Sequence, residues 1–177
     1  MNVLFWIVFG IGIAAILGAL VTGQRFYHNY QRKLETVNTY AIQNVKSGMN
    51  IRPYNAKIPD ETEIIQYKHA NWECMTWQLI SLDDGSTLLK NLYTHKTFQP
   101  SASPEAGVSL FQKPLEANAL QYWEFIGQPD ETYLIRLKGT EFYVTVSDDK
   151  QDSNIILMPK SDADDQRWKL IEQHPVV

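Results

Sequence analysis

The chain has 177 residues and a formal net charge of −4, with 44% hydrophobic and 20% charged residues. This length and apolar content suit one folded domain of roughly 100 to 150 residues plus a short accessory segment, and they exclude two large domains, a disordered chain and a fibrous repeat. The single cysteine excludes an internal disulfide.

Charge is distributed unevenly along the sequence. Residues 1–47 carry four Lys or Arg against one Glu, a net charge of +3, whereas the rest carries twelve basic against nineteen acidic residues, a net charge of −7. An acidic body repels a phosphate backbone, so the sequence predicts no nucleic-acid partner.

The first predicted element is a membrane-spanning helix over residues 3–22. These 20 residues carry no charge, and a helix of that length, rising about 1.5 Å per residue, matches a hydrocarbon core about 30 Å thick. A cleaved signal peptide is the alternative, but the segment lacks a basic start and a good small-x-small cleavage site. We therefore expect residues 1–23 to be a transmembrane anchor, with the lipid bilayer as a partner.

The flanks of this span predict its direction. The nearby Lys and Arg residues all follow the span, and the positive-inside rule assigns such a flank to the cytoplasm. The lone Cys74 and the absence of an Asn-x-Ser/Thr sequon agree with this assignment. We expect a single-pass membrane protein whose C-terminal domain is cytoplasmic.

One face of the span is lined with small side chains. They recur at every fourth residue: Gly10, Ala14, Gly18 and Thr22. Such a face lets another helix approach closely and predicts a membrane-protein partner. The alternative is that Gly and Ala are simply common in membrane helices.

Residues 24–47 are predicted to continue as a helical stalk. Their apolar residues recur mostly at steps of three or four, and Gly48 after Ser47 supplies a stop. The stalk either holds the following domain away from the bilayer or lies on the lipid surface, and the sequence leaves both open.

Residues 48–177 contain a threefold repeat. The pattern Trp, polar, Leu or Phe, Ile begins at Trp77, Trp123 and Trp168, at separations of 46 and 45 residues. Equal spacing indicates structural repeats, and short segments rich in Val, Ile, Tyr, Phe and Thr between turn signals predict about four strands in each. We expect the following pairs to open the repeats, which makes the first repeat the shortest: Ile51-Arg52, Leu89-Lys90 and Ile135-Arg136.

The repeats resemble a known family. Gln121-Tyr122-Trp123 and Gln166-Arg167-Trp168 are similar to the Gln-x-Trp motif of the ricin B-type β-trefoil family, and Met75-Thr76-Trp77 takes the corresponding place without the glutamine. The resemblance covers about residues 48–173. It implies an all-β fold, a β-trefoil whose six-stranded barrel is capped by three hairpins, and it implies that the motif residues form the core of each repeat: Trp77, Gln121, Trp123, Gln166 and Trp168.

The same resemblance bears on sugar binding. Galactose-binding members of the family use an aspartate, a stacking aromatic ring and an Asn or Gln in one repeat. In the third repeat Thr145 stands at the place of the aspartate, and Ile156 falls near that of the glutamine. A shifted pocket in the third repeat is the alternative, with these candidate residues: Tyr143, Asp148, Asp149, Asn154 and Trp72.

No motif for catalysis is present. The sequence lacks a Gly-rich phosphate loop, a serine nucleophile elbow and metal-ligand spacing around Cys74, so we expect no enzymatic activity, no cofactor and no metal. The prediction is a membrane-anchored binding module that acts as an accessory subunit or adaptor through protein contacts. The alternative is a lectin displayed on the extracytoplasmic side, with a glycan as its partner.

Overall fold

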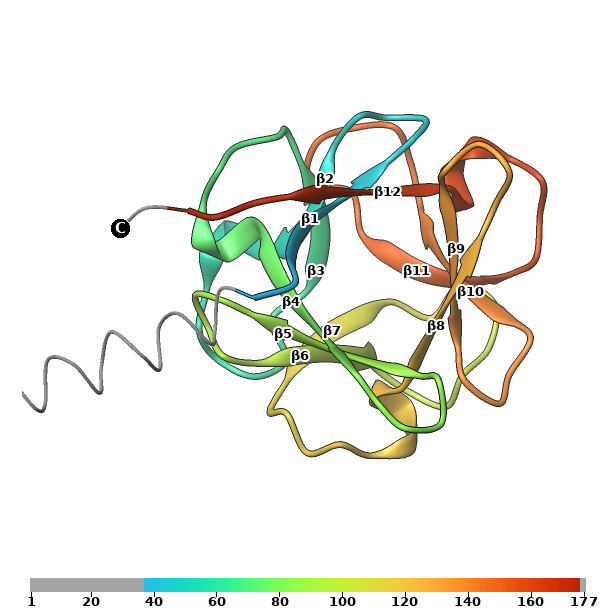
Figure 1. Ribbon diagram of the computed structural model, residues 1–177, viewed down its shortest axis with the longest axis horizontal. Helices are drawn as coiled ribbons and strands as arrows, with labels where there is room; N and C mark the ends of the chain where they lie inside the picture. The colour runs from blue at the N-terminus through green and yellow to red at the C-terminus, as the bar shows by residue number, and fades with distance from the viewer. Residues whose placement is uncertain (1–36, 176–177) are drawn as a thin grey trace, which may run out of the picture. The chain divides into compact units, whose positions relative to one another are not determined.

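The computed structural model describes residues 37–175, which Figure 1 shows as a coloured ribbon. The predicted span over residues 3–22, its small side chains (Gly10, Ala14, Gly18 and Thr22) and the predicted stalk up to residue 36 lie outside the described residues. Within residues 37–175 no helix is long and apolar enough to cross a membrane. The anchor and its membrane-protein partner therefore stay predictions.

The described residues form twelve strands and four single-turn 3-10 helices. The strands are β1 (Thr39–Asn44), β2 (Asn50–Pro53), β3 (Ile64–Tyr67), β4 (Thr76–Ser81), β5 (Thr87–Asn91), β6 (Thr97–Pro100), β7 (Leu110–Lys113), β8 (Trp123–Gly127), β9 (Tyr133–Leu137), β10 (Phe142–Val146), β11 (Ile155–Pro159) and β12 (Trp168–Glu172). The 3-10 helices are η1 (Tyr54–Ala56), η2 (Glu73–Met75), η3 (Ala119–Gln121) and η4 (Asp164–Gln166).

Six of the strands close into a barrel. The antiparallel pairs run β1–β4, β4–β5, β5–β8, β8–β9, β9–β12 and back to β1 through β12. In Figure 1 the first and last strands, β1 and β12, lie side by side and complete the ring. Closure leaves no unpaired barrel edge, which removes the usual route to edge-to-edge association.

The other six strands form three hairpins, β2–β3, β6–β7 and β10–β11. Each hairpin touches the next through isolated backbone bridges, which join Glu63 to Phe111, Ile65 to Asn154 and Ser109 to Ile156. Figure 1 shows the three repeats arranged around a common centre. A closed six-stranded barrel with three mutually bridged hairpins is a β-trefoil, so the predicted all-β fold with three repeats is confirmed.

The N-terminal limit of this fold corrects the sequence prediction. Residues Thr39–Asn44, expected as the end of a helical stalk, form strand β1, and the compact unit begins at Asn38 instead of residue 48. Strand β1 depends on partners far along the chain, such as Leu170 opposite Ile42, and helical periodicity within a segment carries no information about them. Gly48 does take the left-handed conformation, with φ of +68°, but in the turn between β1 and β2.

The same correction changes the first repeat. Its opening strand is β1, whereas Ile51-Arg52 belongs to β2, the first strand of the hairpin. The first repeat is therefore not shortened. Leu89-Lys90 in β5 and Ile135-Arg136 in β9 open the second and third repeats as predicted.

The core is built around the three repeat tryptophans. Trp77, Trp123 and Trp168 are fully buried, and the ring of Phe98 lies 5.1 Å from both Trp77 and Trp123 between ring centroids. At about 25 cal/mol per Å² of apolar surface, burying each indole contributes roughly 4 to 6 kcal/mol relative to an extended chain.

The motif glutamines hold the loops that precede β8 and β12. Gln121 accepts hydrogen bonds from the backbone N–H of Glu116 and Ala117 at 2.9 and 3.0 Å and donates to the carbonyl oxygen of Pro114 at 2.8 Å. Gln166 makes the same kind of ties to Ser161 and Pro159. Buried amides satisfied in this way fix the path of the loop.

In the first repeat a different residue holds the loop that precedes β4. Met75 stands in the place of the glutamine and offers no amide. Instead Gln173, just after β12, donates to the carbonyl oxygen of Ala70 at 3.0 Å and accepts from the hydroxyl of Thr76 at 3.1 Å. The loop of the first repeat is thus tied to the C-terminal end of the described chain.

Candidate functional site

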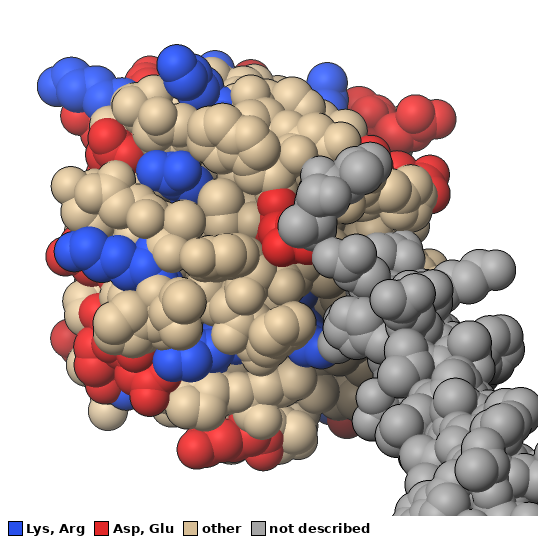
Figure 2. All heavy atoms as spheres, turned by 90° about the vertical axis from the view of Figure 1, so that its left-hand side faces the viewer, with Lys and Arg blue, Asp and Glu red and all other residues tan. Residues whose placement is uncertain are grey.

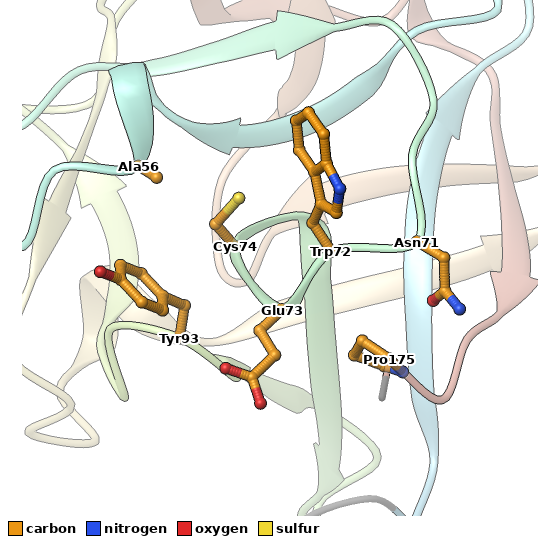
Figure 3. A pocket seen from close by; sticks show the side chains of 7 residues that line it. All are labelled: Ala56, Asn71, Trp72, Glu73, Cys74, Tyr93 and Pro175. Atoms are coloured by element: carbon orange, nitrogen blue, oxygen red, sulfur yellow. The ribbon is translucent and has the colours of Figure 1, made fainter. Parts of the chain in front are cut away.

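A cavity of about 260 Å³ opens beside the loop of the first repeat. We call it the Trp72 pocket, and Figure 3 shows its lining residues. They come from η1, from the segment that leads into β4, from the loop after β5 and from the chain after β12: Ala56, Asn71, Trp72, Glu73, Cys74, Tyr93 and Pro175.

Trp72 forms one wall because its backbone is pinned on both sides. Its carbonyl oxygen accepts from the Met75 N–H at 3.0 Å and from the Thr76 hydroxyl at 2.9 Å, and its own N–H donates to the carbonyl of Ala70 at 3.0 Å. These bonds close the single turn of η2 and leave the indole ring outside the core, where it is 50% exposed. The ring of Tyr67 supports it from 6.5 Å between centroids.

Tyr93 forms the opposite wall, and a buried asparagine links the two walls. The side-chain oxygen of Asn91 accepts from the N–H groups of Tyr93 and Thr94 at 3.2 and 3.1 Å, while its amide donates to the carbonyl of Cys74 at 3.0 Å. Asn91 therefore holds the Tyr93 loop against η2. The Tyr93 ring itself is 44% exposed.

The third side of the pocket has an unusual backbone. Asn55 and Ala56 in η1 both have positive φ, 49° and 52°. Asparagine tolerates this region, but the Cβ of alanine makes it unfavourable by about 1 to 2 kcal/mol. The surrounding structure therefore imposes the conformation that brings Ala56 to the pocket.

The polar groups of the pocket are Asn71, Glu73 and the thiol of Cys74. In Figure 3 the Glu73 carboxylate points away from the Cys74 sulfur, which lies on the side of the Trp72 ring. Burial raises the pKa of the Cys74 thiol, and the charge and hydrogen bond of Arg52 oppose this rise. A thiol kept protonated is a poor nucleophile.

This arrangement suits binding better than bond making. The two exposed rings offer apolar faces, and a carboxylate and an amide in the same lining offer hydrogen bonds. Across residues 37–175 no group of three His, Cys, Asp or Glu side chains could hold a metal ion. The expectation that the protein is not an enzyme stays a prediction.

The predicted third-repeat site is arranged otherwise. Tyr143 is only 4% exposed, whereas Asp148 and Asp149 lie on the exposed loop after β10 and pair with Lys150 at 3.4 Å and Lys46 at 3.0 Å. Hydrogen bonding, chiefly by the Asp149 N–H, lowers the pKa of Asp148.

The remaining two candidates, Asn154 and Trp72, belong to other parts of the structure. Asn154 bridges to Ile65 through its backbone, at the contact between two hairpins. Trp72 lines the pocket of the first repeat, where none of the other four candidates appears. Ligand binding by these five residues stays a prediction, and the structure assigns only Trp72 to a cavity described here.

Sequence reasoning did not identify Tyr93, Asn71 or Glu73. Trp72 gave the one available signal, since it is a tryptophan outside the repeat pattern. Asn71 and Glu73 are its neighbours in the chain. The approach of Tyr93 depends on the pairing of β4 with β5, which the local sequence does not reveal.

A second cavity of about 460 Å³ lies along β1, β9 and β12. We call it the Tyr133 cavity, and it is lined by Tyr40, Asp130, Glu131, Tyr133, Lys169, Leu170 and Ile171. Its Asp130 is already engaged by Arg167 at 2.9 Å and by the Thr132 hydroxyl at 2.6 Å. The Trp72 pocket is the better candidate because its rings, Trp72 and Tyr93, are 50% and 44% exposed, whereas Tyr40 and Tyr133 are partly buried.

Several solved structures share this fold. The designed threefold-symmetric protein ThreeFoil has a TM-score of 0.73 and 23% identity, over 76% of this chain and 98% of that chain. The Macrolepiota procera ricin B-like lectin, solved in complex with lactose, has a TM-score of 0.65 and 18% identity, over 76% and 94% of the two chains. The C-half of the earthworm R-type lectin, in complex with GalNAc, has a TM-score of 0.61 and 12% identity, over 77% and 99%.

At these identities the likeness defines the fold, a β-trefoil of the kind found in ricin B-like lectins. No known family's sequence model matches the chain, and no curated protein matches it.

Proposed function

We propose that the trefoil is a glycan-binding module and that the Trp72 pocket is its binding site. The observation that carries this proposal is the pair of exposed aromatic rings, Trp72 and Tyr93, which face a cavity of about 260 Å³ together with Asn71 and Glu73. A pocket of this size accommodates one sugar residue.

The chemistry of the lining fits a sugar. A pyranose ring has an apolar face of C–H groups that packs on an indole or phenol ring, and hydroxyl groups around its rim. The Glu73 carboxylate accepts hydrogen bonds from such hydroxyls, and the Asn71 amide both donates and accepts. Pinned backbone on both walls reduces the ordering that binding would require.

The structural neighbours support a binding role of this class. Two of them were solved with lactose and with GalNAc. The position implied for an aspartate in the third repeat is occupied here by Thr145, which is 5% exposed and donates to the carbonyl oxygen of Tyr143. We therefore place the site at the Trp72 pocket, where residues of the first and second repeats meet.

Attachment to a membrane belongs to the same proposal. The uncharged run over residues 3–22 would anchor the module. A displayed lectin requires the trefoil on the extracytoplasmic side, whereas the basic residues after the run favour the cytoplasmic side. A reporter fused after Val177 measures this topology. Activity of the reporter outside the cytoplasm would favour a displayed lectin, and activity inside would favour the adaptor role.

The adaptor role is the second candidate function. The basic residues that follow the predicted span support it, because they favour a cytoplasmic domain. The exposed side chains of Ile58, Trp72 and Tyr93 could also contact a protein. Gentle detergent extraction followed by size analysis tests it, since an adaptor would migrate in a complex heavier than the single chain.

A glycan array probed with the detergent-solubilised full chain tests the main proposal. We expect selective binding that Trp72→Ala reduces at least tenfold. Ile58→Ala is the matched control, since Ile58 is 52% exposed but does not line the pocket. Binding that survives Trp72→Ala and is lost in Tyr133→Ala would move the site to the Tyr133 cavity, and an array without any signal would reject the proposal.

A further inference from the structure

Arg52 is a buried cation with no counterion among residues 37–175. It lies in β2, its side chain is 6% exposed, and its Nε atom is buried with no hydrogen-bond partner. The other two arginines of the described chain both pair with carboxylates, Arg136 with Glu124 at 2.7 Å and Arg167 with Asp130 at 2.9 Å. Within residues 37–175 no carboxylate pairs with Arg52.

The neighbours of Arg52 compensate its charge only in part. Its guanidinium carbon lies 3.7 Å from the centre of the Tyr67 ring, a cation–π contact. The charge of Arg52 lowers the pKa of the nearby Cys74 thiol, but a sulfur atom is only a weak acceptor. A ring face and a thiol recover less than a buried charge loses on leaving water.

Comparison of the repeats shows how this cation arises. Trp77 donates to the carbonyl of Ile51 at 3.0 Å, as Trp168 donates to that of Val144, so Arg52 in the first repeat corresponds to Thr145 in the third. Thr145 is satisfied by the motif glutamine, since Gln166 donates to its hydroxyl at 3.0 Å.

The second repeat has the same pair of a motif glutamine and a polar partner, and the first repeat lacks it. Gln121 donates to the side chain of Gln99 at 2.9 Å. In the first repeat the glutamine is replaced by Met75, whose thioether cannot take its place, and its partner is replaced by Arg52. Two changes at one contact turn a closed polar pair into an unpaired positive charge.

This charge lies directly behind the Trp72 pocket. Arg52 stacks on the Tyr67 ring, which lies 6.5 Å from the Trp72 ring between centroids, and its charge also acts on Cys74, which lines the pocket. Figure 3 shows the Cys74 sulfur on the side of the Trp72 ring, with the Glu73 carboxylate turned the other way. Positive potential therefore reaches the pocket at one end only, and the acceptor of hydroxyl groups lies at the other.

The face of the molecule shown in Figure 2 does not provide a comparable selection by charge. On that face, basic and acidic side chains are interspersed. A buried charge in a low dielectric acts on a ligand more strongly than exposed charges do, because solvent and salt screen the latter.

We propose that the Trp72 pocket selects saccharides that carry a carboxylate, with Arg52 as the residue that determines this preference. The inference rests on the glycan-binding function proposed above and adds the class of sugar. The sugar ring packs on Trp72, its acid group lies at the Cys74 end, and its hydroxyls donate to Glu73. A positive charge behind one end of the pocket favours an ionised acid group there over its neutral ester.

Calorimetric titration of the solubilised full chain tests this preference. The probes are an oligosaccharide ending in a uronic acid, the methyl ester of the same oligosaccharide, and a neutral hexose counterpart. We expect the free acid to bind at least tenfold more tightly than its ester, and we expect added salt to reduce this difference only slightly. A sulfated counterpart distinguishes recognition of a carboxylate from recognition of any anion.

The variants separate charge from packing. Arg52→Gln should abolish the preference for the acid while the ester still binds, Arg52→Lys should keep part of the preference, and Trp72→Ala should weaken all probes alike. Arg167→Gln is the matched control and should change nothing. The comparison of acid with ester in the unmodified protein needs no variant, so it stands even if Arg52→Gln fails to fold.

Two results would overturn the inference in different ways. Equal binding of acid and ester, or a preference that persists in Arg52→Gln, would reject the role of Arg52 and leave the glycan-binding function intact. Binding of the sulfated probe in preference to the uronic acid would replace carboxylate recognition by sulfate recognition. Failure of every saccharide to bind would reject both proposals together.

Discussion

The first and third repeats share one backbone plan and differ in what they do with it. In the third repeat a buried glutamine, Gln166, ties its own loop and satisfies Thr145. In the first repeat Met75 takes the place of the glutamine, Gln173 ties the loop from outside, and Arg52 is left without a polar partner of that kind.

The difference teaches how a symmetric scaffold acquires one distinct site. The three tryptophans keep the barrel closed in every repeat, so the polar contact beside each can change without loss of the fold. The altered contact of the first repeat lies beside an exposed pair of rings, Trp72 of the first repeat and Tyr93 from the loop after β5 of the second repeat. If core and pocket are separate, substitutions in the core should change stability and substitutions in the pocket should change binding.

The largest expected effect separates a core indole from a pocket indole. Trp168→Ala should lower the free energy of unfolding by about 3 to 5 kcal/mol, because it leaves a cavity among fully buried neighbours. Trp72→Ala should lower it by only about 1 to 2 kcal/mol, because half of that side chain is already exposed. Urea denaturation measures both, and similar losses would contradict the separation.

The next effect comes from giving the second repeat the residue found in the first. Gln121→Met should cost about 2 to 3 kcal/mol, because the N–H groups of Glu116 and Ala117 and the carbonyl of Pro114 lose their partner. Gln151→Met on an exposed loop is the control. A stability unchanged by Gln121→Met would show that the motif glutamine is dispensable in every repeat.

The substitute tie of the first repeat should matter less. Gln173→Ala removes the bonds to Ala70 and Thr76 and should cost about 1 to 2 kcal/mol. It should also weaken saccharide binding, because the loop from Ala70 carries Trp72. Thermal unfolding and calorimetric titration give the two values, and a variant as stable as the parent would remove Gln173 from the account.

The smallest effect is a loss of stability in acid shared by two equivalent turns. Lys138 and Ser86 lower the pKa of Asp84, and the Thr132 hydroxyl, with Arg167, lowers that of Asp130. Each carboxylate is more acidic in the folded chain than its ordinary value of 3.8. Its contribution is therefore present above about pH 4 and is lost as the pH falls further.

Asp84→Asn, followed by urea denaturation between pH 7 and pH 2, checks this expectation. The variant should show a smaller decrease of stability on acidification than the parent. Because Asp84 is exposed, we expect a modest change, and identical slopes for the two proteins would assign the acid sensitivity to other groups.

The sequence predicts the threefold plan because the tryptophan spacing is visible along the chain. It fails at β1, where Val37, Tyr40 and Ala41 fall at helical steps of three and four. The deciding partners of Tyr40 and Ala41 are Trp77 and Ile171, far along the chain. A segment whose structure depends on closure of a barrel cannot be assigned from its own residues.

The site was predictable only in part for the same reason. Trp72 stands out because it lies outside the repeat pattern, but the approach of Tyr93 and the isolation of Arg52 follow from pairing across strands. The Asp148 and Asp149 cluster is conspicuous in the sequence, yet both carboxylates are engaged by lysines in an exposed loop. Residues that are neighbours in the sequence thus indicated a charged turn, whereas the pocket is formed by residues from separate segments.

The most direct test of a binding site at the Trp72 pocket is the indole N–H spectrum of the ¹⁵N-labelled full chain during addition of the uronic-acid oligosaccharide. Trp72→Phe assigns one signal, and the account predicts that this signal alone shifts in a saturable manner while those of Trp77, Trp123 and Trp168 stay in place. A saturable shift confined to another indole, or no shift at any concentration of saccharide, would contradict it.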